Sequence, residues 1–189
     1  SNNLILRWAA LLHDIGKPET LTIDQQGNRH FYKHELESSI VTNRILLRLK
    51  QPKVRIQRIK VLVKHHMVLK NTGPNGEKAS DRQLRRLIVN IGRDLDLLLN
   101  LIHADNISHK DEHQLANQVP MLRLRLKKID AELRDFNFPV TGKDIICTYR
   151  IPSSPLIGRL LKIAREKWYA DLSISKADLL IYLGKYIEH

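Results

Sequence analysis

The stretch LLHDIGKPETL, residues 11–21, sets a histidine beside an aspartate at the end of an apolar run. Gly16 and Pro18 follow at once, so the helix predicted before the pair ends here. A helix end can direct both side chains of His13 and Asp14 at one ion, with Gly16 allowing the chain to turn sharply. The pair is therefore either part of a metal site or two polar residues at a solvated helix end.

Helical periodicity surrounds this stretch. Apolar residues recur at the spacing of one helical face in residues 4–12 and again in residues 40–49. Helical patterns also cover residues 54–65, 81–91, 95–103 and 111–134. The sequence therefore predicts an all-α fold.

One segment departs from the helical period. ETLTID, residues 19–24, and RHFY, residues 29–32, flank the Gly-containing QQGN. This alternation around a glycine predicts a hairpin-like loop or an irregular excursion. Residues 70–80, rich in Gly, Pro and Asn, are predicted to form a loop.

A domain boundary is expected near FNFPV, residues 136–140. Thr141 with Asp144, and Ser175 with Asp178, have the spacing of helix capping boxes, so each pair is predicted to begin a helix. The sequence thus predicts two domains, residues 1–138 and a small helical region over residues 139–189.

Composition limits the class of protein. With 189 residues, 42% of them hydrophobic, the chain can bury a core. Cys147 is the only cysteine, which excludes a disulfide framework and favours a reducing compartment. Neither a signal peptide nor a run of about 20 apolar residues is present. We expect a soluble cytoplasmic protein, and the opening Ser1 suggests a fragment of a longer chain.

Positive charge dominates. Lys and Arg number 32 against 20 acidic residues, a net charge of +12. Such an excess favours a polyanionic partner such as nucleic acid or an acidic membrane surface, although it also fits the solvated faces of a basic protein. The candidate phosphate contacts come from two basic stretches, and they are Arg48, Lys53, Arg55, Arg58, Lys60, Arg123, Arg125 and Lys128.

Histidines and carboxylates stand at or near the ends of apolar helical faces: His13, Asp14, His34, His65, His66 and Asp105. If the fold brings these ends together, imidazole and carboxylate ligands form a set suited to divalent transition metals. Spacing alone does not show that they converge, and a histidine on an apolar face is more often a hydrogen-bonded core residue than a metal ligand.

Three segments together resemble a known family: residues 7–39, LVKHHM at 62–67 and LIHADNIS at 101–108. They resemble the HD superfamily of metal-dependent phosphohydrolases. More closely, they are similar to the HD-containing C-terminal part of bacterial tRNA nucleotidyltransferases and poly(A) polymerases. Residues 138–167 resemble a later segment of that family, so the similarity covers nearly the whole chain.

The resemblance implies residue roles. His13 and Asp14 would be metal ligands, and Asp105 the distal carboxylate. His34 and His65 would match the additional histidines of some members, with His66 as a further candidate. Lys17 would lie beside the phosphate and share the catalytic role with Asp14, or it is simply a cation at a helix C-terminus. The implied cofactor is a divalent metal such as Ni, Mn, Zn, Fe or Mg.

The sequence departs from the family pattern in two places, and each departure leads to an expectation about the activity of this chain. The first family histidine normally precedes the His-Asp pair by a few dozen residues, and residues 1–12 contain none. Metal occupancy is therefore expected to be weak or absent in this chain. No Gly-rich segment with paired catalytic aspartates is present either, so the chain is not expected to add nucleotides.

Three hypotheses remain open. The chain is the HD and RNA-binding portion of a tRNA nucleotidyltransferase or poly(A) polymerase-like enzyme, supporting tRNA while an absent domain transfers nucleotides. Alternatively, it is a metal-dependent phosphohydrolase acting on 2′,3′-cyclic phosphates or nucleotides. The third possibility is a non-catalytic helical interaction module. Neither a membrane partner nor a particular oligomeric state is predicted.

Overall fold

A computed structural model describes residues 3–187 and confirms the all-α class. The chain forms two compact units, residues 1–79 with 91–124 and residues 80–90 with 125–189. The domain boundary after residue 138 remains a prediction. Within the described residues no helix combines the length and the apolar character needed to cross a bilayer.

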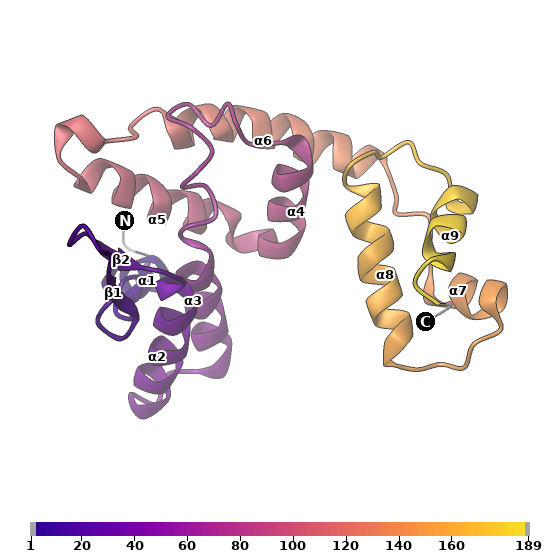
Figure 1. The fold of residues 1–189 in the computed structure, drawn as a ribbon, viewed down its shortest axis with the longest axis horizontal. Helices are drawn as coiled ribbons and strands as arrows, with labels where there is room; N and C mark the ends of the chain where they lie inside the picture. The colour runs from indigo at the N-terminus through magenta and orange to yellow at the C-terminus, as the bar shows by residue number, and fades with distance from the viewer. Residues whose placement is uncertain (1–2, 188–189) are drawn as a thin grey trace. The chain divides into compact units, whose positions relative to one another are not determined.

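The first unit contains most of the elements that precede residue 124 (Figure 1). In chain order they are α1 (Leu4–Leu12), the 3-10 turn η1 (Pro18–Thr20), β1 (Leu21–Ile23), β2 (Arg29–Phe31), α2 (His34–Arg48), α3 (Lys53–His65), η2 (Gly92–Asp94), α5 (Leu95–Ser108) and η3 (Asp111–His113). Helix α6 (Gln118–Asp135) begins in this unit.

Helix α3 lies at the centre of the first unit. It packs against α1, α2 and α5, and α1 also contacts α5. Burial of apolar side chains from these helices supplies the main favourable free energy of folding. The buried apolar residues of these four helices are Ala9, Leu12, Leu46, Ile56, Ile59, Leu62, Val63, Leu98, Leu99, Leu101 and Ile102.

The segment after α1 is a true hairpin. Strands β1 and β2 pair antiparallel, with Leu21 opposite Phe31 and Ile23 opposite Arg29. The turn uses Gly27 at φ +81°, a backbone conformation that glycine adopts without strain. Of the two alternatives left open by the sequence, the regular one is confirmed.

Two helix boundaries differ from the predicted ones. Helix α5 continues to Ser108 instead of ending near residue 103, so Asp105 lies within the helix. The helix predicted over residues 111–134 begins only at Gln118, after the short turn η3. Pro120 explains the late start, because proline has no N–H and is tolerated only in the first turn of a helix.

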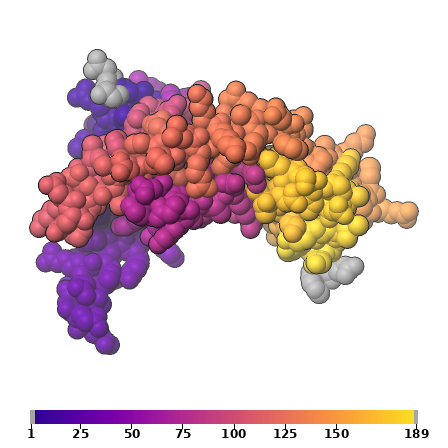
Figure 2. Space-filling model, turned by 90° about the horizontal axis from the view of Figure 1, so that it is seen from above, coloured from indigo at the N-terminus to yellow at the C-terminus, as the bar shows by residue number. Residues whose placement is uncertain are grey.

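The second unit contains α4 (Asp81–Ile91) up to Asn90, the later part of α6, and the helices α7 (Gly142–Tyr149), α8 (Pro155–Trp168) and α9 (Lys176–Gly184). Its core gathers Val140, Ile145, Ile157, Leu160, Ala164, Trp168, Leu179 and Leu183. Helices α7 to α9, orange to yellow in Figure 2, form one continuous mass. The capping box of Thr141 and Asp144 is confirmed, and Ser175 caps α9.

Candidate metal and phosphate site

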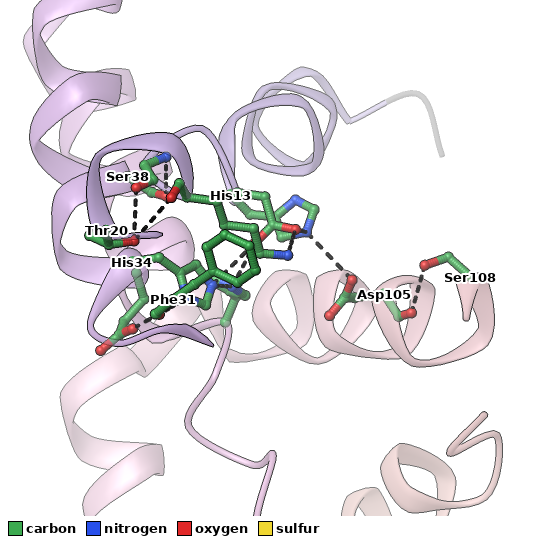
Figure 3. A network of polar contacts seen from close by, with 12 residues as sticks. His13, Thr20, Phe31, His34, Ser38, Asp105 and Ser108 are labelled. Carbon is green, nitrogen blue, oxygen red and sulfur yellow. Dashed lines mark hydrogen bonds and ion pairs between the residues drawn. The ribbon is translucent and has the colours of Figure 1, made fainter. Parts of the chain in front are cut away.

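Four elements of the first unit meet around the His-Asp pair (Figure 3). His13 is the C-cap residue of α1, and Asp14 lies in the turn that follows. His34 is the first residue of α2, and His66 is the C-cap residue of α3. Asp105 reaches the same place from α5. Helix packing therefore brings these five side chains together, which their spacing in the sequence could not show.

The three histidines of this cluster share one orientation. The Nδ1–H of His13 donates to Ala10 O at 2.9 Å, that of His34 to Phe31 O at 2.9 Å, and that of His66 to Val63 O at 2.7 Å. A carbonyl oxygen only accepts, so each contact places a proton on Nδ1. In the neutral ring each Nε2 then carries a lone pair, the state in which imidazole binds a metal.

The Nε2 atoms face Asp14. Its Oδ1 lies 3.2 Å from His34 Nε2 and 3.7 Å from His66 Nε2, and its Oδ2 lies 3.3 Å from His13 Nε2. His34 Nε2 and His66 Nε2 are 3.2 Å apart. Two lone pairs at that distance repel each other, and a carboxylate adds further negative charge. The arrangement therefore requires a positive charge between these atoms, either a proton or a metal ion.

His13 lies between two carboxylates. Its Nε2 is 3.3 Å from Asp14 Oδ2 and 3.4 Å from Asp105 Oδ1. Burial lowers the pKa of His13, but the contacts with Asp105 and Asp14 outweigh burial and raise that pKa to about 10. Burial raises the pKa of Asp14, yet His13 and Lys17 hold it well below the ordinary value; contact with His13 also lowers the pKa of Asp105.

The donor set fits a divalent metal. His13 Nε2 is buried and has no hydrogen-bond partner of good geometry among the described residues. Ligand atoms of His13, Asp14 and His66 all lie within 4.8 Å of one another. A protein normally pairs a buried nitrogen of this kind. Because two carboxylates lie 3.3 and 3.4 Å from it without a well-aligned hydrogen bond, this place suits a cation, either a proton on the ring or a metal ion.

His65 does not join this cluster in the way that its neighbour does. Its Nδ1–H donates to Val61 O, one turn back in its own helix, at 2.9 Å. The side chain turned toward Asp14 is that of His66, which is almost wholly buried. The structure thus brings together His13, Asp14, His34, His66 and Asp105.

Lys17 borders the cluster on its solvent side. Its Nζ donates to Asp14 Oδ2 at 2.5 Å and lies 5.8 Å from the centre of the Phe31 ring. The side chain is 38% exposed, so the ammonium group is available to an anion that approaches the cluster. Lys17 is therefore a candidate phosphate contact, and its place just after α1 also fits a cation at the end of that helix.

Gly16 holds the His-Asp turn against α2. Its N–H donates to Ser38 Oγ at 2.9 Å, and its carbonyl accepts from Thr20 Oγ1 at 3.0 Å (Figure 3). A Cβ on Gly16 would lie 2.5 Å from Ser38 N and 2.9 Å from His34 O. Its φ is not in the left-handed region, so close approach to α2, not the sharp turn, is what requires glycine.

Replacing Gly16 with alanine is expected to lower the free energy of unfolding by about 2 kcal/mol, because the new methyl group overlaps α2 backbone atoms that cannot rotate away. Gly158→Ala is the matched control. A Cβ at Gly158 meets nothing within 4 Å inside α8, so this change is expected to stabilise by about 0.5 kcal/mol. Urea unfolding of both variants measures the difference, and equal effects would contradict the close approach.

The predicted phosphate contacts fall into two groups. Arg58 forms a bidentate ion pair with the buried Asp94. Arg123 pairs with Asp96 at 2.6 Å, and Arg125 pairs with Asp81 at 2.8 Å. Arg55 donates to Gln51 Oε1 at 2.7 Å. Each of these guanidinium groups already has a hydrogen-bond or ion-pair partner within the chain.

The other four basic residues form no ion pair with a carboxylate of residues 3–187: Arg48, Lys53, Lys60 and Lys128. Lys53 and Lys60 are seven residues apart and share one face of α3.

The second unit contains an aromatic group that was not predicted from the sequence. Lys167 and Lys185 approach the ring of Tyr182. The spacing of Tyr182 and Lys185, three positions apart, was its only local sequence signal, because Lys167 comes from another helix.

Comparisons with known proteins identify a family for this chain and two of its relatives. The model of the HD domain family matches residues 1–96. The chain is 32% identical over 169 residues to an A-adding tRNA nucleotidyltransferase of Deinococcus radiodurans, covering 87% of this chain and 37% of that protein. It is 29% identical over 168 residues to a CC-adding tRNA nucleotidyltransferase of Thermus thermophilus, covering 85% and 35%. The chain thus spans little more than a third of these relatives, and no solved structure matches it.

Proposed function

The chain belongs to the HD-domain family, and from this premise we propose that it is the RNA-binding C-terminal portion of a tRNA nucleotidyltransferase. The observation that carries the proposal is the extent of similarity. The family match ends at residue 96, whereas the similarity to two tRNA nucleotidyltransferases covers 169 and 168 residues and so includes most of the second unit. Nucleotide transfer itself would belong to a part of the protein outside this chain.

Charge supports an RNA partner. The net charge of +12 favours a polyanion, and the side chains of Arg48, Lys53, Lys60 and Lys128 are not neutralised by carboxylates of the described residues. The same proposal implies a cytoplasmic location, because tRNA is found in the cytoplasm and an exposed free thiol such as that of Cys147 stays reduced there.

The affinity of the chain for tRNA is expected to fall steeply with salt, with a log-log slope of roughly 0.7 to 0.9 for each phosphate contact. Replacing Arg48, Lys53 and Lys60 together with glutamine should weaken binding by about 10-fold at low salt and reduce the slope. Fluorescence anisotropy with labelled tRNA across a salt series measures both quantities.

The matched control removes the same charge elsewhere, from the exposed Lys70, Lys78 and Lys110. It is expected to change the slope less than the first triple variant does. If the two triple variants behave alike, net charge and not this surface carries the affinity. If neither changes the slope, the contacts lie elsewhere, with Arg123, Arg125 and Lys128 as the next candidates.

A second candidate function is metal-dependent phosphoester hydrolysis, which the contact between His34 Nε2 and His66 Nε2 favours. His13, Asp14, His34, His66 and Asp105 would hold the ion. Three imidazoles with carboxylates suit Zn, Mn, Fe or Ni better than Mg, which prefers oxygen ligands. Such an ion supplies Lewis-acid polarisation of a phosphoryl oxygen.

The protein's own residues have separate tasks in that reaction. The carbonyls of Ala10, Phe31 and Val63 fix the tautomers of the three histidines. Lys17, partly exposed beside Asp14, would pair with a phosphoryl oxygen and neutralise charge that develops on it. Phe31, below the Lys17 ammonium group, keeps one side of that group apolar and its charge poorly screened.

A further inference from the structure

Helix α2 carries large apolar side chains on its exposed side. Its buried side chains include Thr42 and Leu46, and among the elements of residues 3–187 only α3 and η1 pack closely against it (Figure 1). Leu36, Ile40 and Leu47 are 41%, 54% and 53% exposed. Single exposed apolar side chains are common on protein surfaces, but these three lie in one row along the helix.

The spacing of this row is that of a coiled-coil seam. Leu36, Ile40, Asn43 and Leu47 follow one another at intervals of four, three and four residues. At 100° per residue the four side chains leave the helix within a sector of about 60°. We call these four residues the α2 seam. A seam with this spacing packs against a second helix that has the same spacing.

The α2 seam is complementary to itself. When two copies of α2 lie antiparallel about a two-fold axis, Leu36 lies opposite Leu47 of the second copy and Ile40 lies opposite Asn43. Both pairs are centred between residues 41 and 42, so one register satisfies them, and the symmetry repeats each pair. The two Asn43 residues are then offset by about 4.5 Å along the helix axis, near enough for their amides to hydrogen-bond. One polar position in an apolar seam fixes the register.

The charges beside the seam favour the antiparallel orientation. Glu37 and Arg44 each follow a seam residue directly and flank the seam on the same edge. Arg44 Nη2 lies 3.7 Å from Glu37 Oε1 within the chain, and the Arg44 side chain is 64% exposed. In the antiparallel pair Glu37 of each copy lies beside Arg44 of the other, whereas a parallel pair does not bring them together. Arg48 points to another side of α2, so the RNA contact proposed for it stays open.

We propose that two copies of this chain associate through the α2 seam as an antiparallel pair of helices related by a two-fold axis. A helix of 15 residues is only about 22 Å long, so the interface is small and the dimer forms reversibly. His34 begins α2, and the two copies of His34 therefore lie at opposite ends of the helix pair. Association thus keeps the two histidine clusters apart.

Sedimentation equilibrium between about 10 and about 500 µM protein tests the proposal. The wild type is expected to show a monomer–dimer equilibrium with a Kd of about 100 µM. Ile40→Lys should weaken association at least about 10-fold, because it places two ammonium groups in the seam. Ile181→Lys makes the same change at an exposed isoleucine of α9 and should leave the equilibrium unchanged. Circular dichroism checks that both variants keep their helix content.

Charge reversal tests the flanking ion pairs. Glu37→Arg should weaken association about 3-fold, because each Arg44 then faces an arginine of the other copy. Adding Arg44→Glu reverses both partners and should restore the wild-type equilibrium. If the double variant dimerises no better than Glu37→Arg, the two residues are not partners across the interface.

Disulfide cross-linking tests the orientation, with Cys147→Ser as background so that the natural thiol does not react. A mixture of Leu36→Cys and Leu47→Cys proteins should cross-link under mild oxidation, whereas each protein alone should not. In the antiparallel register residue 36 lies opposite residue 47 of the second copy. The two copies of residue 36 are then offset by about 16 Å, and a disulfide requires Cα atoms within about 7 Å.

Three outcomes would overturn the proposal. A wild type that stays monomeric at about 500 µM shows that the α2 seam does not bind itself, and another partner would then have to cover it. A dimer that Ile40→Lys leaves intact uses a different surface. Cross-linking of Leu36→Cys with itself instead of with Leu47→Cys shows a parallel pair, which contradicts the proposed register.

Discussion

Asp14→Ala is expected to abolish metal binding at the histidine cluster and, with it, any metal-dependent phosphodiester hydrolysis. Asp14 is the residue that all three histidines share: its two oxygens contact the Nε2 atoms of His13, His34 and His66. Without this carboxylate the cluster keeps three imidazoles but loses the negative charge that holds a cation among them. Nucleotide addition by a longer parent protein should continue, because it would use other carboxylates.

The neighbouring residues His65 and His66 provide a control for the metal-binding experiment. His66 Nε2 lies 3.7 Å from Asp14 Oδ1, whereas His65 hydrogen-bonds to Val61 of its own helix. His66→Ala should therefore weaken metal binding strongly and His65→Ala should leave it nearly unchanged. Asp130→Ala, which removes a partly exposed aspartate paired with Arg134, tests whether loss of any carboxylate has the same effect.

The measurement is a metal titration followed by mass spectrometry of the bound metal, beside hydrolysis of a 2′,3′-cyclic nucleotide. Both are carried out on this chain and on the longer parent protein that the proposed function implies. If the parent protein binds no metal and Asp14→Ala behaves like the wild type, the His-Asp pair is structural. The non-catalytic interaction module would then be the better description.

Arg58→Ala is expected to lower the free energy of unfolding by about 3 kcal/mol. Arg58 Nε lies 2.9 Å from Asp94 Oδ1, and Nη2 contacts the same oxygen. The Asp94 side chain is only 8% exposed, so removing Arg58 leaves a buried carboxylate without its partner. The pair also joins α3 to the turn before α5, the helix that carries Asp105.

Urea unfolding checks this expectation. Lys53→Ala, which changes an exposed cation of the same helix, should alter stability by less than about 0.5 kcal/mol. The double variant Arg58→Ala with Asp94→Ala should recover part of the loss, because no buried charge is then left unpaired. If Arg58→Ala keeps full stability but binds tRNA less tightly, Arg58 is a phosphate contact, as the sequence interpretation had it.

Local patterns predicted most of the secondary structure, although two helix boundaries were wrong. The helical period predicted the helix over residues 81–91 at both of its ends. The glycine between two alternating runs indicated the hairpin, and the spacing of Thr141 and Asp144 indicated the start of α7. Each of these signals involves residues a few positions apart, so their interactions are largely fixed by backbone geometry. Pro120, which delays α6, was also a local signal, but it was overlooked.

Which helical face is buried was less clear from the sequence. Leu11 belongs to the predicted apolar stripe of α1, yet it is 71% exposed, while Ala9 is fully buried. The difference arises because α1 turns toward α3 and α5, and a small residue allows the close approach. Apolar periodicity specifies a stripe about 100° wide, and neighbouring helices decide which part of it is covered.

The sequence by itself determined the all-α class and a set of candidate metal ligands that included every residue of the cluster, and it narrowed the segment after α1 to a hairpin-like loop or an irregular excursion. Only the tertiary structure decided that His66 and not His65 faces Asp14, that Gly16 is needed for contact with α2, and that Arg58 pairs with Asp94. Adjacent helical residues point about 100° apart, so their roles depend on where the partner helices lie. Those partners are 22 to 52 residues away along the chain, and their positions follow from packing of the whole unit and not from any local pattern.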